Sequence, residues 1–423
     1  MRKFDPRRIA ASLLMQNVAA LYGVQIGRKL IPLVTIPYLA RVLGIAGWGK
    51  VAFVTAVSEF VVIAIEFGFN LSATREIARH RKSPAACGEV MSGVLGAQAL
   101  LALVGVSLAV IASRWIPLLH DNPALLIGGL VYGVSQGFAP LWFFQGLERL
   151  RLSSALEIGG KLGTLCGMFL FIHSPADAWK WMTLCGIAPA MSTVVALSIA
   201  YQTIPLRRPT FSLVSTALRM GWPMFVFRSA ESLYGVGNAL LLGLFAGPEI
   251  VGYFASAEKI SKAAYGLLTP IRDSLFPRLS HLAKSGGLGG AALAKQGAAV
   301  MIGGGVLLGG GIFAAAPLLI RLVLGGDYAP AVSALRILAF LPVLLSITNS
   351  AAMQWLLPFG KDAVINRIII MAGLLNLALS LFLAPRSAHI GMAWAVVCSE
   401  AFVCVSMVAA VANMTPRRVR AYA

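Results

Sequence analysis

Apart from residues at the edges of the stretches, such as Arg41, thirteen charged residues lie inside otherwise apolar stretches of this chain. A charged side chain at the centre of a bilayer costs roughly 2.5–3.5 kcal/mol on an insertion scale. Charged residues at this depth therefore indicate contacts with a ligand, coupling to an ion, or ion pairs in which the charges neutralise one another. The thirteen are Arg28, Lys29, Glu59, Glu66, Glu157, Lys161, Arg228, Glu231, Glu258, Lys259, Lys262, Arg336 and Glu400.

The cations among them suit an anionic ligand such as a diphosphate, because arginine supplies forked donors and lysine a point charge. The carboxylates are candidates for coupling to a proton or cation, and equally for counter-ions to the cations. The predicted ligand contacts are Arg28, Lys29, Arg228, Lys259, Lys262 and Arg336. The predicted coupling or counter-ion group is Glu59, Glu66, Glu231, Glu258 and Glu400.

Six of the thirteen are spaced to neutralise one another on a single helix, at i,i+3 or i,i+4. For these six a structural role and a functional role stay equally open. The pairs are Arg228 with Glu231, Glu258 with Lys262, and Glu157 with Lys161.

The elements that must position these charges follow from composition. The chain has 423 residues, of which 58% are hydrophobic and 12% charged, and its mean hydropathy is +0.81. Soluble proteins carry about a quarter of their residues as charged side chains, so these values predict a polytopic membrane protein. At about 20 residues per crossing, the length allows roughly a dozen helices and no soluble catalytic domain. The expected spans are 14–43, 51–73, 88–112, 124–146, 152–172, 181–202, 221–246, 250–271, 296–320, 331–357, 368–384 and 390–412.

The net charge of +19 has a topological explanation. With the N-terminus inside, the cytoplasmic segments hold 22 of the 35 basic residues and the outer loops hold five. This split over short loops is the positive-inside pattern. It places both termini in the cytoplasm and argues against nucleic-acid binding.

Twelve crossings with both ends on one side divide naturally into two halves of six. The predicted fold is all-α: an N-terminal lobe over 1–205, a cytoplasmic linker over 206–220 and a C-terminal lobe over 221–423. A shift of 203 residues superposes Gly44 on Gly247 and Arg75 on Arg278. Because each half has an even number of crossings, the lobes are expected to be related by a pseudo-two-fold axis along the membrane normal.

A central cavity between the lobes is expected, because spans one, two, seven and eight carry nine of the thirteen charges. Spans three, four, six, nine and eleven carry none and are expected to form an outer scaffold. The same shift places Arg28 on Glu231 and Glu59 on Lys262, so we expect contacts of opposite charge between the lobes.

Several motifs resemble one known family. They are Leu30-Ile31-Pro32 with Pro37-Tyr38-Leu39-Ala40-Arg41-Val42-Leu43-Gly44 and Gly47-Trp48-Gly49, then Phe67-Gly68 with Ala73-Thr74-Arg75-Glu76, Pro140 to Arg149, Val251 to Ile260, and Leu275-Phe276-Pro277-Arg278. Across almost the whole chain they resemble bacterial flippases of O-antigen and exopolysaccharide repeat units. These form the polysaccharide-transport branch of the multidrug/oligosaccharidyl-lipid/polysaccharide exporter superfamily.

The resemblance implies a substrate and a direction. The substrate is an undecaprenyl-diphosphate-linked oligosaccharide, moved from the cytoplasmic to the periplasmic leaflet without any bond changing. It also implies membrane lipid as a partner, with polymerase and chain-length proteins of the same pathway as further candidates. No cofactor is expected, and a coupling ion, H⁺ or Na⁺, stays open.

Two alternatives remain at this point. The first is an ion-coupled drug/cation antiporter of the same superfamily, which the cavity cations disfavour because they would repel cationic drugs. The second is a membrane-bound polymerase or ligase. That chemistry needs a large outer loop, whereas the longest predicted outer loops, 113–123 and 321–330, have only about a dozen residues.

Overall fold

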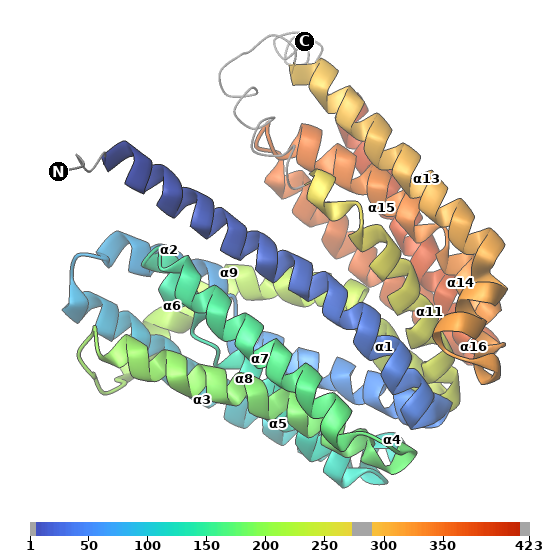
Figure 1. Ribbon diagram of the computed structural model, residues 1–423, viewed down its shortest axis with the longest axis horizontal. Coiled ribbons are helices and arrows are strands. Elements are labelled where there is room, and N and C mark those ends of the chain that lie inside the picture. The colour runs from blue at the N-terminus through green and yellow to red at the C-terminus, as the bar shows by residue number, and fades with distance from the viewer. Residues whose placement is uncertain (1–5, 273–289, 415–423) are drawn as a thin grey trace. The chain divides into compact units, whose positions relative to one another are not determined.

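The computed structural model describes residues 6–272 and 290–414, and every regular element in those ranges is helical (Figure 1). The chain divides into two compact units. The first comprises Met1–Leu43 with Val54–Ser229, and the second comprises Gly44–Phe53 with Ala230–Ala423. The lobe limits expected from the sequence, 1–205 and 221–423, stay a prediction.

Helices in the N-terminal half of the chain are interrupted at a few residues. Helix α1 contains Gly44 at φ 67°, a left-handed value that glycine adopts without strain. Phe67 and Gly68, both with positive φ, separate α1 from α2, and Pro140 separates α5 from α6. The elements are α1 (Pro6–Glu66), α2 (Phe69–His80), α3 (Pro84–Ala112), α4 (Pro117–His120), α5 (Pro123–Gly137), α6 (Leu141–Gly146), α7 (Leu150–Phe171), the 3₁₀ turn η1 (Pro175–Asp177), α8 (Ala178–Tyr201) and α9 (Phe211–Gly235).

The second unit contains a π-helical turn and a helix that folds back on itself. Within α16, Ser387 and Ala388 leave helical geometry, and a Cβ added to Gly391 would meet the carbonyl oxygen of Leu383. Residues eight apart are this close only where the chain reverses. The elements are α10 (Gly237–Phe245), α11 (Pro248–Gly266), α13 (Gly290–Val323), the 3₁₀ turn η2 (Gly326–Tyr328), α14 (Ala331–Leu338), α15 (Leu341–Ser350), the π turn η3 (Ala351–Leu356) and α16 (Asp362–Ala412).

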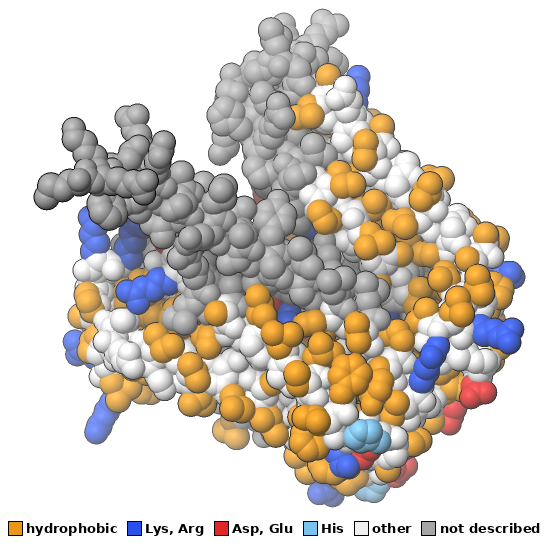
Figure 2. All heavy atoms as spheres, viewed as in Figure 1, with side chains coloured by type: hydrophobic (Ala, Val, Ile, Leu, Met, Phe, Trp, Pro, Cys, Tyr) orange, Lys and Arg blue, Asp and Glu red, His pale blue; other side chains and the backbone are white. Residues whose placement is uncertain are grey.

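Large apolar side chains lie on the outside of both units. Leu103 of α3 is 68% exposed and Leu307 of α13 is 74% exposed, in spans that the sequence predicts to be part of an outer scaffold. Figure 2 shows apolar side chains spread over the visible surface, with charged side chains gathered toward its margins. Such surfaces need lipid rather than water around them.

Seven helical stretches among the described residues are long and apolar enough to cross a membrane. The chain is therefore a multi-pass membrane protein. Two of the stretches, Val34–His80 with 47 residues and Asp362–Ala412 with 51, are each long enough for two crossings of about 20 residues. The twelve crossings expected from the sequence stay a prediction.

Candidate functional site

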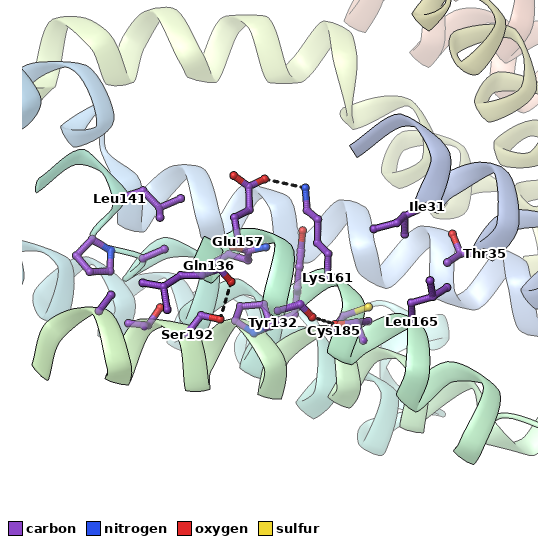
Figure 3. Close-up of a pocket in the computed structure, with 18 of the residues that line it drawn as sticks. Ile31, Thr35, Tyr132, Gln136, Leu141, Glu157, Lys161, Leu165, Cys185 and Ser192 are labelled. Atoms are coloured by element: carbon purple, nitrogen blue, oxygen red, sulfur yellow. Dashed lines mark hydrogen bonds and ion pairs between the residues drawn. The ribbon is translucent and has the colours of Figure 1, made fainter. Parts of the chain in front are cut away.

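A cavity of about 240 Å³ lies inside the first unit, between α1, α5, α7 and α8. Helix α5 packs closely on α8, and α7 packs on the same helix, so α8 forms the shared wall. Figure 3 shows Ile31 and Thr35 of α1 at one end of the cavity and Leu141 of α6 at the other.

Polar side chains from four helices line this cavity, beginning with Thr35 of α1. Tyr132 and Gln136 are four residues apart on α5, and Glu157 and Lys161 are four apart on α7, so each pair shares one helix face. Helix α8 adds a further set, Cys185, Ser192 and Thr193.

Most of these residues carry no charge, so the pattern of charges in the sequence does not reveal them. Spans four and six, which the sequence predicts to be part of an outer scaffold, contain residues of α5 and α8 that line this cavity. The recurrence of Tyr132 and Gln136 at i,i+4 in an apolar span is the signal that could have found them.

An ion pair lies at the cavity wall. Lys161 Nζ is 2.8 Å from Glu157 Oε1, and the side chains are 38% and 17% exposed (Figure 3). The pairing expected from the i,i+4 spacing is therefore confirmed. Away from bulk water such a pair is held more strongly than on a protein surface, and it offers a cation and an anion to a polar ligand.

Two predicted carboxylates lie on the same unit. The Tyr132 hydroxyl donates to Glu59 Oε1 at 2.6 Å, which fixes the tyrosine ring at the cavity wall. Glu66 Oε2 is 3.8 Å from Arg228 Nη2, a pairing between α1 and α9 that spacing on one helix does not reveal. Arg228 itself is half-exposed.

The second unit contains another charged group. Glu258 is buried and accepts from Lys262 Nζ at 2.9 Å and from Asn238 Nδ2 at 3.1 Å. The predicted i,i+4 pair is again confirmed. Lys262 also donates to the Gly235 carbonyl at 2.9 Å, and Lys259 Nζ lies 4.3 Å from the ring centroid of Trp48.

The remaining predicted residues are distributed over other elements. Arg336 of α14 is exposed and lies 5.8 Å from the ring centroid of Phe313. Glu400 is buried and accepts from Thr348 Oγ1 at 3.0 Å, whereas Glu231 is exposed on α9. Arg28 and Lys29 belong to α1, and their side chains lie outside the described residues.

Glu59 and Lys262, matched across the halves by the sequence, each have a partner in their own unit. The polar cavity between the halves stays a prediction. The Leu275–Arg278 motif lies outside the described residues, as does most of the basic segment around it.

The arrangement suits recognition and passage of a polar ligand by a membrane transporter. Solved structures of transporters share the fold. The lipid II flippase MurJ in an inward closed conformation matches 96% of this chain and 89% of its own, with a TM-score of 0.69 at 14% identity. The eukaryotic MATE transporter AtDTX14 matches 96% of this chain and 98% of its own, with a TM-score of 0.59 at 12% identity.

Sequence comparison identifies the family within this class. The family model described as polysaccharide biosynthesis protein matches residues 14–283, and the chain belongs to that family. The resemblance carried by the motifs is thereby confirmed.

Two curated relatives align over nearly their whole length. One, from Escherichia coli K12, is named "Putative O-antigen transporter" and is 29% identical over 95% of this chain and 97% of its own. A protein of the same name from Shigella dysenteriae is 29% identical over 92% of this chain and 96% of its own. These names describe transport, in agreement with the prediction that the chain is not an enzyme.

Proposed function

We propose that this protein is a flippase that moves undecaprenyl-diphosphate-linked oligosaccharide repeat units from the cytoplasmic to the periplasmic leaflet. The relatives named O-antigen transporters support this substrate class, and the fold of the lipid II flippase supports the transport of a polar group on a lipid carrier. Both termini then face the cytoplasm of a bacterial inner membrane.

The observation that carries the proposal is a cavity whose largely apolar wall includes hydroxyl, amide and ionic side chains, within helices whose outer faces are apolar. Hydroxyl, amide and ionic groups on its wall can exchange hydrogen bonds with sugars, while the prenyl chain stays in lipid. Lys161, Arg228, Lys259, Lys262, Arg336, Arg28 and Lys29 are the proposed cationic contacts to the diphosphate during passage.

Deleting the gene tests the proposal directly. We expect lipid-linked oligosaccharide to accumulate on the cytoplasmic leaflet and surface polymer to be lost, with both restored by the wild-type chain. Polymerase and chain-length proteins, proposed partners, should remain at normal levels.

Two other outcomes contradict the proposal. Normal surface polymer together with sensitivity to cationic drugs would identify a drug antiporter of the same fold. Lipid-linked repeat units that reach the periplasmic leaflet but stay unpolymerised would point instead to a defect after the flipping step.

A further inference from the structure

One segment of the first unit exposes large apolar and cationic side chains next to each other. It is the connection that leaves α8 and continues into the first half of α9. Its most exposed apolar side chain, Phe211, is 90% exposed. We call the exposed set the elbow surface, and its members are Leu206, Arg207, Arg208, Phe211, Arg219 and Trp222.

Helix α9 packs on the rest of the unit through one face. A Cβ added to Gly93 of α3 would collide with the carbonyl oxygen of Leu213, and one added to Gly68 would collide with Met224 Cβ. Leu213, buried Ala217 and Met224 are spaced i, i+4 and i+11, so they share a helix face. These close approaches fix the rotation of α9 on the unit.

The opposite face of α9 carries its part of the elbow surface. Phe211, Arg219 and Trp222 are spaced i, i+8 and i+11, so they lie on a common face, away from the packed one. The Trp222 ring is held by tilted contacts with Phe67 and Phe225, at 6.0 and 5.8 Å between ring centroids, and is still 56% exposed. The apolar rings are therefore presented outward in a fixed position.

The elbow surface lies beside the beginning of α3. A Cβ added to Gly88 would meet the Pro205 carbonyl oxygen, and one added to Gly96 would meet the Pro209 side chain. At 1.5 Å per residue these glycines lie about 6 and 18 Å from the start of α3. The 29 residues of α3 span about 43 Å, the thickness of a hydrocarbon core with both headgroup layers. The connection therefore runs through one headgroup layer to the edge of the hydrocarbon.

The arginines of the elbow surface are not neutralised within the protein. Among the residues that the structure describes, no ion pair involves Arg207, Arg208 or Arg219. Residues 202–222 contain no Asp or Glu. The exposed carboxylate of Glu89 lies one residue from the contact of α3 with the connection, so three guanidinium groups face one carboxylate. The surface keeps a net positive charge at headgroup depth.

From these positions we propose that the elbow surface binds an anionic phospholipid of the leaflet in which it lies. Arg207, Arg208 and Arg219 contact the phosphate, because a guanidinium group offers forked donors that fit phosphate oxygens. Phe211 and Trp222 contact the first carbons of the acyl chains, since aromatic side chains favour the boundary between headgroups and hydrocarbon. Basic groups beside a membrane-embedded apolar face are the pattern that attracts anionic lipids.

Lipid titration of the full-length protein in detergent tests the surface. Phosphatidylglycerol should raise the midpoint of thermal unfolding by about 2–4 °C and then saturate. Phosphatidylcholine with the same acyl chains should have less than half of this effect. Ionic strength of about 0.5 M should weaken the response to phosphatidylglycerol, because salt screens exposed charges. Native mass spectrometry should show phosphatidylglycerol retained in preference to phosphatidylcholine.

The variants separate this surface from net charge. Arg207→Gln with Arg208→Gln should weaken the affinity for phosphatidylglycerol roughly tenfold or more. Phe211→Ser should weaken binding of both lipids and leave the preference for the anionic one. The matched control is Arg114→Gln with Arg321→Gln, which removes two exposed arginines of the predicted outer loops and should keep the full response. Each variant is compared with its own unfolding midpoint without lipid.

Four results would overturn the surface. They are an equal response to both lipids, an unchanged response in the Arg207→Gln/Arg208→Gln variant, an equal loss in the control, or the same response to inorganic diphosphate without lipid. The last would identify a site for a soluble anion. The inference does not depend on the transported substrate. A chain that responds to phosphatidylglycerol but does not restore surface polymer would contradict the flippase and leave the elbow surface standing.

Discussion

Single carboxyl groups at membrane depth are satisfied in two different ways. Glu157 and Glu258 each have a lysine at hydrogen-bond distance, whereas Glu59 and Glu400 accept from the uncharged hydroxyls of Tyr132 and Thr348. A lysine partner neutralises the charge within the protein. A hydroxyl partner does not, so we predict that Glu59 and Glu400 are the better candidates for ion coupling and that Glu157 and Glu258 serve as counter-ions.

Charge reversal tests whether export depends on the Glu157–Lys161 pair. Glu157→Lys and Lys161→Glu each place two like charges one turn apart beside the cavity, and each should reduce surface polymer at least tenfold. The double swap restores an i,i+4 pair and should recover most of the export. Polymer yield per amount of folded protein measures the effect.

Arg79→Ala is the control for this experiment. Arg79 is 73% exposed in its pair with Glu76, and surface pairs contribute about 0–1 kcal/mol, so export should be unchanged. A double swap that is as inactive as the single variants, in protein that folds normally, would show that the pair's orientation matters as well as its charge.

At the scale of elements, the breaks between helices are set by close packing as much as by flexibility. Gly68 separates α1 from α2 at φ 77°, and a Cβ at this position would collide with Met224 Cβ of α9. Gly221 of α9 faces the same corner, since a Cβ added to it would collide with the Phe67 carbonyl oxygen. The backbones of the α1–α2 corner and α9 approach each other directly here.

Gly68→Ala should therefore destabilise the first unit. The left-handed backbone alone costs a residue with a Cβ about 1–2 kcal/mol, and the collision with Met224 adds to this cost. Thermal unfolding of the purified protein measures it. Gly159→Ala is the matched control, because Gly159 lies within α7 with nothing within 4 Å of an added Cβ. Alanine there should be neutral or stabilise by up to about 1 kcal/mol. Equal stability of the two variants would contradict the packing argument.

For the whole molecule, the number of crossings decides where the ends lie. An even number places both termini on one side, whereas an odd number places them on opposite sides. The seven stretches found by length and apolarity include two that are long enough to cross twice, and α16 reverses at Ser387 and Ala388.

Reporter fusions distinguish these arrangements. Alkaline phosphatase fused after Asp121 or Ser387 should be active in the periplasm, and fusions after Arg208 or Asn413 should be inactive. An active fusion after Asn413 would contradict the cytoplasmic C-terminus and the count of twelve.

Several properties were determined by the sequence alone. Hydropathy and the scarcity of charge define a multi-pass helical protein, and the family motifs define its relatives. The pairs Glu157–Lys161 and Glu258–Lys262 were also predictable, because residues four apart on one helix are neighbours wherever that helix packs.

Only the tertiary structure decided which helices meet. Tyr132 and Glu59 are separated by 73 residues, and Glu66 meets Arg228 from a distant helix. The cavity takes part of its polar lining from α5 and α8, which carry no charge within their predicted spans. Such contacts depend on how each helix is rotated and on how closely glycines let backbones approach. Spacing along a single chain contains neither quantity, so these partners emerge only when the helices pack.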